Sequence, residues 1–134
     1  MPAAKPHASF AYAILRVVPR VERGERLNVG VVVFCRQRDF LDMRAQVDEA
    51  RLAALAPDLD AGAVSVSVEA IRAVLCGEPA GGALAALAAS DRFGWAVAPA
   101  STIIQPSQVH TGLTDDPAAT LARLFDTLVA TTAR

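Results

Sequence analysis

The chain has 134 residues, of which 53% are hydrophobic and 20% are charged, and 13 basic and 14 acidic residues give a net charge of −1. This length fits one domain that buries roughly two thirds of its unfolded surface. Because no apolar run reaches the ~20 residues of a membrane-spanning helix, we expect no membrane insertion. A net charge near zero gives no overall field for phosphate backbones, so nucleic-acid binding is unsupported.

The first eight residues contain Pro2 and Pro6 and little periodicity, which predicts a flexible tail ahead of a single domain at 9–134. The chain does not open with the charged head, apolar core and cleavage site of a secretion signal. Its two cysteines, Cys35 and Cys76, are expected to be reduced and partly buried. These features predict a cytoplasmic location.

Three strands are expected in the first third of the chain. Residues 9–18 are apolar on both alternating faces apart from Arg16, which is typical of a central strand. Residues 27–35 form a second apolar run that keeps Gly30, where another backbone or a ligand could come close. Residues 40–44 follow a turn and are expected to pair back, so that the three strands form an antiparallel meander.

Helical periods replace the strand alternation after position 48. Asp48 is a good N-cap for a short helix that stops before Pro57. Asp60 is a good N-cap for a longer helix that ends near Gly77. The stretch 64–68 also alternates as a strand would, but the apolar spacing continues at four, three and four residues, which favours a helix.

The rest of the chain predicts one more strand between two helices. An alanine-rich helix is expected over 83–89, and a returning strand over 101–105. Asp116 as N-cap and Pro117 at the first helical position begin the last helix. The sequence therefore predicts an α+β fold, with an antiparallel sheet of about four strands packed against three to four helices.

Arg16, Arg23, Glu25 and Asn28 are the first group of candidate binding residues. An arginine within an apolar strand must reach a carboxylate, a backbone carbonyl or an anionic ligand. One reading pairs Arg16 with Glu25 to fix the strand register, and the other makes Arg16 part of an anion site. Asn28 either caps the turn backbone or takes part in the same site.

A second group lies in the segment 109–116, which is expected to be a loop that enters the last helix. His110 and Thr111 beside the helix amides could bind or act on a phosphate. The same residues could only shape the turn, with Gly112 at a positive φ and Asp116 as cap. His110 is the best candidate for a catalytic residue, and we expect the mouth of the second strand to meet this segment.

Other kinds of site have weaker support. The histidines and cysteines lack metal-ligand spacing, so no metal is expected. No glycine-rich phosphate fingerprint occurs, so no nucleotide cofactor is expected. Cys35 with His110 would make a nucleophilic pair only if the fold brought them together. Phe93 and Trp95 are expected to be core anchors, with a stacking platform as the alternative.

Several short blocks in a fixed order carry a resemblance that spans 10–129. They are Tyr12-Ala13 with Arg16 and Pro19, Arg23-Gly24-Glu25, Asn28-Val29-Gly30-Val31 with Phe34, Arg92-Phe93 with Trp95, Val109-His110-Thr111-Gly112, Asp116-Pro117 and Leu124-Phe125. In these blocks the chain resembles the uncharacterised bacterial family called domain of unknown function 3037. It differs at Ala96, where leucine is common, and at Ala100, where an arginine is expected.

The resemblance implies a partner and no reaction. Members can be encoded next to kinases that resemble the HipA toxin type, which implies an accessory role beside such a kinase. If the arginine absent at Ala100 serves an anion site in the family, its loss weakens the case for that site here.

The residues and the family resemblance together leave three hypotheses for the function. The leading hypothesis is a small binding or accessory module that acts with a protein partner. The second is an enzyme or binding protein for a phosphate-bearing substrate, with His110 as acid or base and Arg23 as anion anchor. The third is a structural homo-oligomer, such as a homodimer, that packs through the alanine-rich helices.

Overall fold

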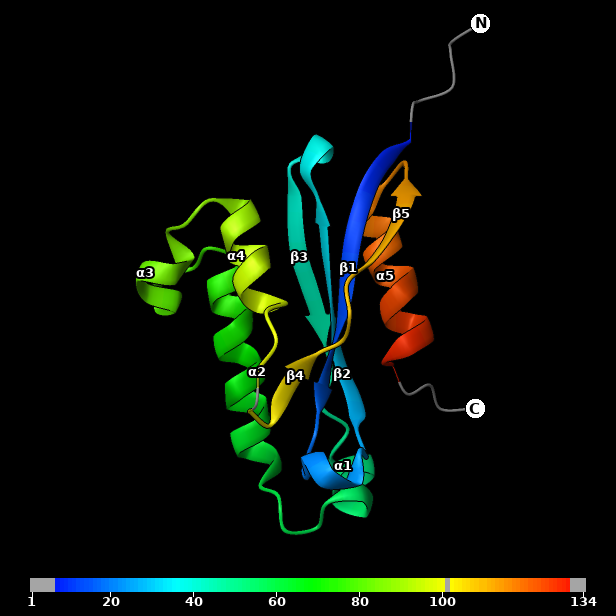
Figure 1. Ribbon diagram of the computed structural model, residues 1–134, viewed down its shortest axis with the longest axis vertical. Coiled ribbons are helices and arrows are strands. Elements are labelled where there is room, and N and C mark those ends of the chain that lie inside the picture. The colour runs from blue at the N-terminus through cyan, green and yellow to red at the C-terminus, as the bar shows by residue number, and fades with distance from the viewer. Residues whose placement is uncertain (1–6, 101, 131–134) are drawn as a thin grey trace, which may run out of the picture.

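The computed structural model describes residues 7–100 and 102–130, and within them an antiparallel sheet lies between helices on its two faces (Figure 1). The strands are β1 (Ala8–Val17), β2 (Leu27–Cys35), β3 (Phe40–Ala45), β4 (Ile104–Pro106) and β5 (His110–Thr114). The α-helices are α1 (Glu49–Leu55), α2 (Ala61–Leu75), α3 (Gly82–Ala85), α4 (Ala89–Ala96) and α5 (Pro117–Leu128). Short 3₁₀ turns are η1 (Val21–Arg23), η2 (Arg36–Arg38) and η3 (Pro79–Gly81). The predicted α+β fold is confirmed.

β1 is the central strand, as its two apolar faces predict. It pairs with β2 on one side, and β2 pairs with β3, so the predicted meander is confirmed. On its other side β1 pairs with β5 through its first half and with β4 through its second half. Ser107 spans the gap between β4 and β5, because the Ile14 N–H donates to Ser107 Oγ at 2.9 Å. The Ser107 N–H donates back to the Ile14 carbonyl at 2.8 Å.

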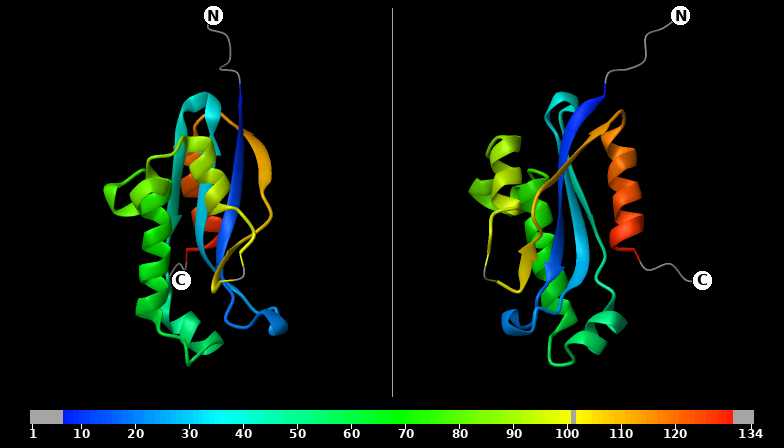
Figure 2. Two further views of the ribbon diagram at one scale, coloured as in Figure 1. Left: turned by 60° about the vertical axis from the view of Figure 1, so that its left-hand side comes forward. Right: turned by 45° about the vertical axis from the view of Figure 1, so that its right-hand side comes forward.

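α2 and α4 lie on one face of the sheet and α5 lies on the other (Figure 2), and the two faces bury different cores. We call them the α2 face and the α5 face after the helices that cover them. The α2 face contributes Leu15, Val17, Leu27, Val29, Val32 and Met43 to a core with α1, α2 and α4. The α5 face contributes Ala8, Phe10, Val31, Val33 and Cys35 to a core with Leu121 and Leu124 of α5. Alternation along β1 and β2 thus fills both layers.

An irregularity in the β1–β2 register sets where the polar residues of β2 lie. Leu15 pairs with Gly30 but Arg16 pairs with Asn28, so Val29 is an extra residue in β2. The Val29 carbonyl accepts from the Gln46 N–H at 2.8 Å instead. A Cβ at Gly30 would lie 3.3 Å from the carbonyl oxygen of Arg44, so this glycine lets the backbone of β3 come close.

Three helices begin where the sequence predicts. Asp48, Asp60 and Asp116 are the N-caps of α1, α2 and α5, and each carboxylate accepts a backbone N–H of the first turn. No helix in the described ranges is long and apolar enough to cross a bilayer.

Three local predictions need correction. The segment 110–114, predicted as a loop, is the strand β5, because pairing with the edge of β1 satisfies its backbone. The helix predicted over 83–89 is split: α3 ends at Ala85 and α4 begins at Ala89. β1 begins at Ala8, inside the range expected for the tail, and Ser101, expected to start the returning strand, lies outside the described residues.

Candidate functional site

Arg23 and Glu25 lie together in the loop between β1 and β2. Arg23 Nε donates to Glu25 Oε1 at 2.6 Å, and both side chains are largely exposed. This hydrogen bond raises the pKa of Arg23 and lowers the pKa of Glu25. The expected Arg16–Glu25 pair is therefore replaced by a local pair. Exposed pairs of this kind contribute little stability.

The Arg23–Glu25 pair lines a pocket of about 540 Å³ against the connection between α1 and α2. Its lining residues are Pro19, Arg20, Arg23, Glu25, Ala54, Leu55, Ala56, Pro57, Asp58 and Leu59. Neither His110 nor Asn28 is among them. Because Glu25 already neutralises Arg23, the pocket offers less positive charge than the sequence suggests.

Asn28 joins β2 to the last helix. Its Nδ2 donates to the carbonyl of Leu128 at 3.1 Å, at the C-terminal end of α5. Asn28 thus satisfies one of the carbonyls that a helix end leaves without a partner. It lies opposite Arg16 across the β1–β2 pair, and its amide binds a helix end rather than the turn backbone that the sequence suggested.

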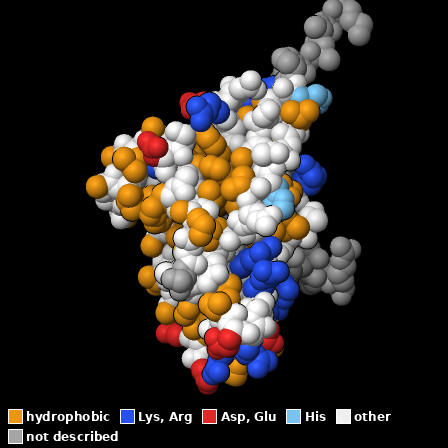
Figure 3. Space-filling view, in the orientation of Figure 1, with side chains coloured by type: hydrophobic (Ala, Val, Ile, Leu, Met, Phe, Trp, Pro, Cys, Tyr) orange, Lys and Arg blue, Asp and Glu red, His pale blue; other side chains and the backbone are white. Residues whose placement is uncertain are grey.

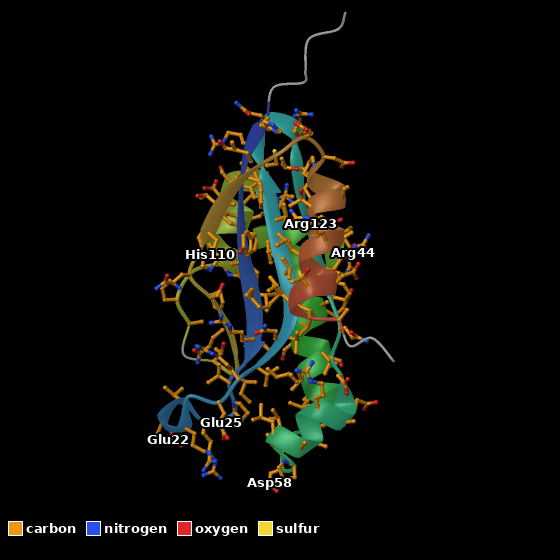
Figure 4. All side chains as sticks on the ribbon, turned by 90° about the vertical axis from the view of Figure 1, so that its right-hand side faces the viewer. Glu22, Glu25, Arg44, Asp58, His110 and Arg123 are labelled. Atoms are coloured by element: carbon orange, nitrogen blue, oxygen red, sulfur yellow. The ribbon has the colours of Figure 1, made fainter. Side chains whose placement is uncertain are left out.

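His110 and Thr111 are exposed residues at the start of β5. His110 pairs with Tyr12, and the two ring centroids are 5.1 Å apart. Figure 4 shows His110 beside the middle of the sheet and Glu25 in the loop beyond its lower end. The structure therefore does not bring the two predicted groups together in one pocket.

The N-terminus of α5 is also closed by its own residues. Asp116 Oδ1 accepts the Ala119 N–H at 3.2 Å, and the Asp116 N–H donates to Thr114 Oγ1 at 3.0 Å. Thr114 and Thr120 are both buried, and their hydroxyl oxygens are 2.6 Å apart. These contacts fix β5 to α5 and make this helix end a structural junction.

Trp95 is not the core anchor that the sequence predicts. Phe93 is a core anchor as expected, and its ring centroid lies 5.2 Å from that of Phe34. Trp95, two residues later on α4, is instead 38% exposed. The i, i+3 spacing of the buried pair Phe93 and Ala96 is the signal that places Trp95 on the outer side of a helix.

Trp95 lies between two hollows of about 330 and 460 Å³ on the α2 side of the molecule. Both hollows include Ile71, Trp95, Thr102 and Ile104, so we treat them as one depression and call it the Trp95 groove. None of the described residues that line it is charged; the others are Leu15, Ser67, Ala70, Val74, Ala80, Gly81, Ala96, Ala98, Pro99, Ala100, Ile103 and Pro106.

Further exposed hydrophobic side chains lie on the elements around the groove. Figure 3 shows hydrophobic side chains over α3 and α4, with few charged side chains among them. Ile103 is 41% exposed at the groove itself. Val66 on α2, Leu84 on α3 and Leu87 between α3 and α4 are also exposed. An apolar surface with several such side chains is typical of an interaction site.

The comparisons with known proteins identify the family. The model of a family described as proteins of unknown function, DUF3037, matches residues 12–129. The chain belongs to the DUF3037 family. No curated protein and no solved structure matches it.

Within this DUF3037 protein, the resembling blocks include residues with clear structural roles. Arg92 donates through Nη1 to the carbonyl of Leu75 and through Nε to that of Leu87, which ties the end of α2 to the start of the α4 region. Asp116 caps α5, and Gly112 lies under a core ring. Trp95 differs from these residues, because it is 38% exposed and lines both hollows of the groove.

Proposed function

We propose that this DUF3037 protein is a binding module whose Trp95 groove receives an amphipathic helix of a partner protein. The single observation that supports this best is an exposed tryptophan between two hollows without charged lining residues. Buried tryptophan is a frequent energetic centre of protein interfaces. Two adjacent hollows suit apolar side chains one helical turn apart, as in other helix-in-groove complexes.

The edge of the sheet beside the groove favours a helix over an added strand. Ile103 and Ser107 direct backbone groups toward β1, so the backbone N–H and C=O groups of the alternate positions 104 and 106 point away from β1. Pro106 has no N–H, and the Ile104 carbonyl already accepts from Thr102 Oγ1 at 2.7 Å. Proline and satisfied carbonyls on an edge strand oppose strand addition.

The other two hypotheses find less support. An enzyme that uses His110 with Arg23 needs both side chains in one pocket, and the pocket at Arg23 does not include His110. A homo-oligomer remains an outcome of the test below, because a second copy could also cover the groove. A HipA-like kinase is the first partner to examine, since the family resemblance implies one.

The test compares variants of the groove with a matched exposed residue elsewhere. Trp95→Ala and Ile103→Ser remove apolar surface at the groove, while Leu113→Ser changes a 65% exposed leucine on β5. Each tagged variant is used to capture proteins from native lysate, and the captured protein is then purified and titrated directly. We expect a partner that wild type and Leu113→Ser bind and the two groove variants bind at least tenfold more weakly.

Two results would contradict the proposal. One is a set of captured proteins whose affinities are unchanged by Trp95→Ala. The other is light scattering that shows a dimer in wild type and a monomer in Trp95→Ala, which would make the groove an interface between copies of this chain.

A further inference from the structure

Arg16 lies in the middle of a row of polar side chains that crosses three strands. Its cross-strand partners are Asn28 of β2 and Gln105 of β4. Directly opposite residues of an antiparallel pair project to the same face, so all three lie on the α5 face. α5 packs mainly on β2 and β3, and the β1–β4 side of this face is less covered. Arg16, Asn28 and Gln105 are each partly exposed, so the row is accessible to a small ligand.

A second guanidinium group lies close to Arg16. Arg26 directly precedes β2, two residues before Asn28, so it is the diagonal neighbour of Arg16 on the same face. Burial and the charge of Arg26 both lower the pKa of Arg16. Figure 3 shows Lys and Arg side chains gathered where β4 lies beside the start of β2.

Neither arginine has a carboxylate partner within the described ranges. The ion pairs there use other cations: Arg23 pairs with Glu25, Arg72 with Glu69 and Glu78, and His7 with Asp115. Arg16 Nε is buried and donates to no acceptor among the described residues. Both amides of the row are already donating to carbonyls, Asn28 to Leu128 and Gln105 to Thr102.

An unpaired donor and two adjacent like charges are each unfavourable, because nothing offsets the lost hydration or the repulsion. An oxyanion between the two guanidinium groups removes both costs at once. Guanidinium groups bind phosphate through parallel charge-assisted hydrogen bonds, and two of them match its double charge. Arg23, with Glu25 bound to it, lacks this free capacity.

We propose that Arg16 and Arg26 form a binding site for the phosphate group of a small phosphorylated molecule. The site is separate from the Trp95 groove, since it lies on the opposite face of the sheet and shares no lining residue with it. It takes up the alternative reading of Arg16 as part of an anion site, with Arg26 rather than Arg23 or His110 as the second residue.

The test measures phosphate binding by isothermal titration at constant ionic strength, first with inorganic phosphate and then with glycerol phosphate. Arg16→Gln and Arg26→Gln remove one charge each, Arg26→Lys keeps the charge, and Arg123→Gln removes an exposed arginine on α5 (Figure 4). We expect at least tenfold weaker binding in the two glutamine variants, wild-type binding in Arg123→Gln, and partial recovery in Arg26→Lys.

The design separates this proposal from the proposed function and from misfolding. Trp95→Ala should bind phosphate as wild type does, whatever its effect on partner capture. Arg26 is exposed, so Arg26→Gln decides the matter even if Arg16→Gln does not fold. No heat of binding beyond that of chloride, or equal affinity in Arg26→Gln and Arg123→Gln, would overturn the proposal.

Discussion

The ring of Phe10 on β1 lies over Gly112 on β5 and leaves no room for a side chain there. A Cβ at position 112 would lie 2.8 Å from Cε1 of that ring. The same ring stacks on Tyr12, at 6.0 Å between centroids, and Tyr12 in turn contacts His110. β5 is therefore held to the central strand by a row of aromatic contacts with glycine at one end and histidine at the other.

Gly112→Ala should destabilise the protein. The added methyl group must displace the ring of Phe10, which is buried against α5 and its neighbours. Overpacking of this kind costs about 1–3 kcal/mol. Urea unfolding followed by circular dichroism measures the loss as a lower midpoint with an unchanged slope.

Gly94→Ala provides the matched control for that substitution. Gly94 lies within α4, and a Cβ there would meet no atom within 4 Å. Alanine favours a helix over glycine by ~1 kcal/mol, so this variant should be at least as stable as wild type. Equal loss of stability in both variants would show that the contact with Phe10 is not the cause.

The hydroxyl pair of Thr114 and Thr120 should show energetic coupling. Thr114→Val leaves the buried hydroxyl of Thr120 and the Asp116 N–H without a partner, at a cost of about 1–3 kcal/mol. The double variant Thr114→Val/Thr120→Val removes both hydroxyls, so it should cost less than the sum of the single variants. Free energies of unfolding for the four proteins give the coupling, and strict additivity would refute a direct interaction.

Cys76 should react slowly with iodoacetamide. Burial, the hydrogen bond from its Sγ to Asp42 and the charge of Asp42 raise the pKa of this thiol. A raised pKa lowers the thiolate fraction near pH 8 and shifts the rate profile to higher pH. Asp42→Asn removes the charge but keeps an oxygen for the Met43 N–H, so it should speed the reaction.

Cys35 serves as the internal reference in the same experiment. It is fully buried on the α5 face, and it should be modified only after unfolding. Peptide mapping by mass spectrometry separates the two sites. An Asp42→Asn variant whose Cys76 reacts no faster than in wild type would contradict the assigned cause of the pKa shift.

The sequence was sufficient for elements whose signals are local. The N-caps Asp48, Asp60 and Asp116 and the apolar runs of β1 and β2 mark their own boundaries, and the structure places them there. β5 was missed because its residues are polar and include Gly112. Its pairing depends on β1, about a hundred residues earlier in the chain, which no local pattern reports.

The candidate sites also depend on contacts that no local sequence pattern reports. The sequence singled out Arg16 as a residue in need of a partner, and its Nε has none in the described structure. It could not show that Glu25 binds Arg23 instead, because the loop geometry decides between two nearby arginines. The sequence predicts Trp95 as a core residue, because an aromatic pair at alternate positions does not reveal that a helix turns one of them outward.

Trp95 is the single tryptophan of the chain, so its fluorescence reports on the groove alone. The most direct test of the Trp95 groove as the partner-binding site is the emission of Trp95 while the purified partner is added to the wild-type protein. If the partner's helix occupies the groove, the emission should shift to shorter wavelength and acrylamide should quench it less. A partner that saturates the protein without changing the emission wavelength or the acrylamide quenching of Trp95 would contradict binding at the groove.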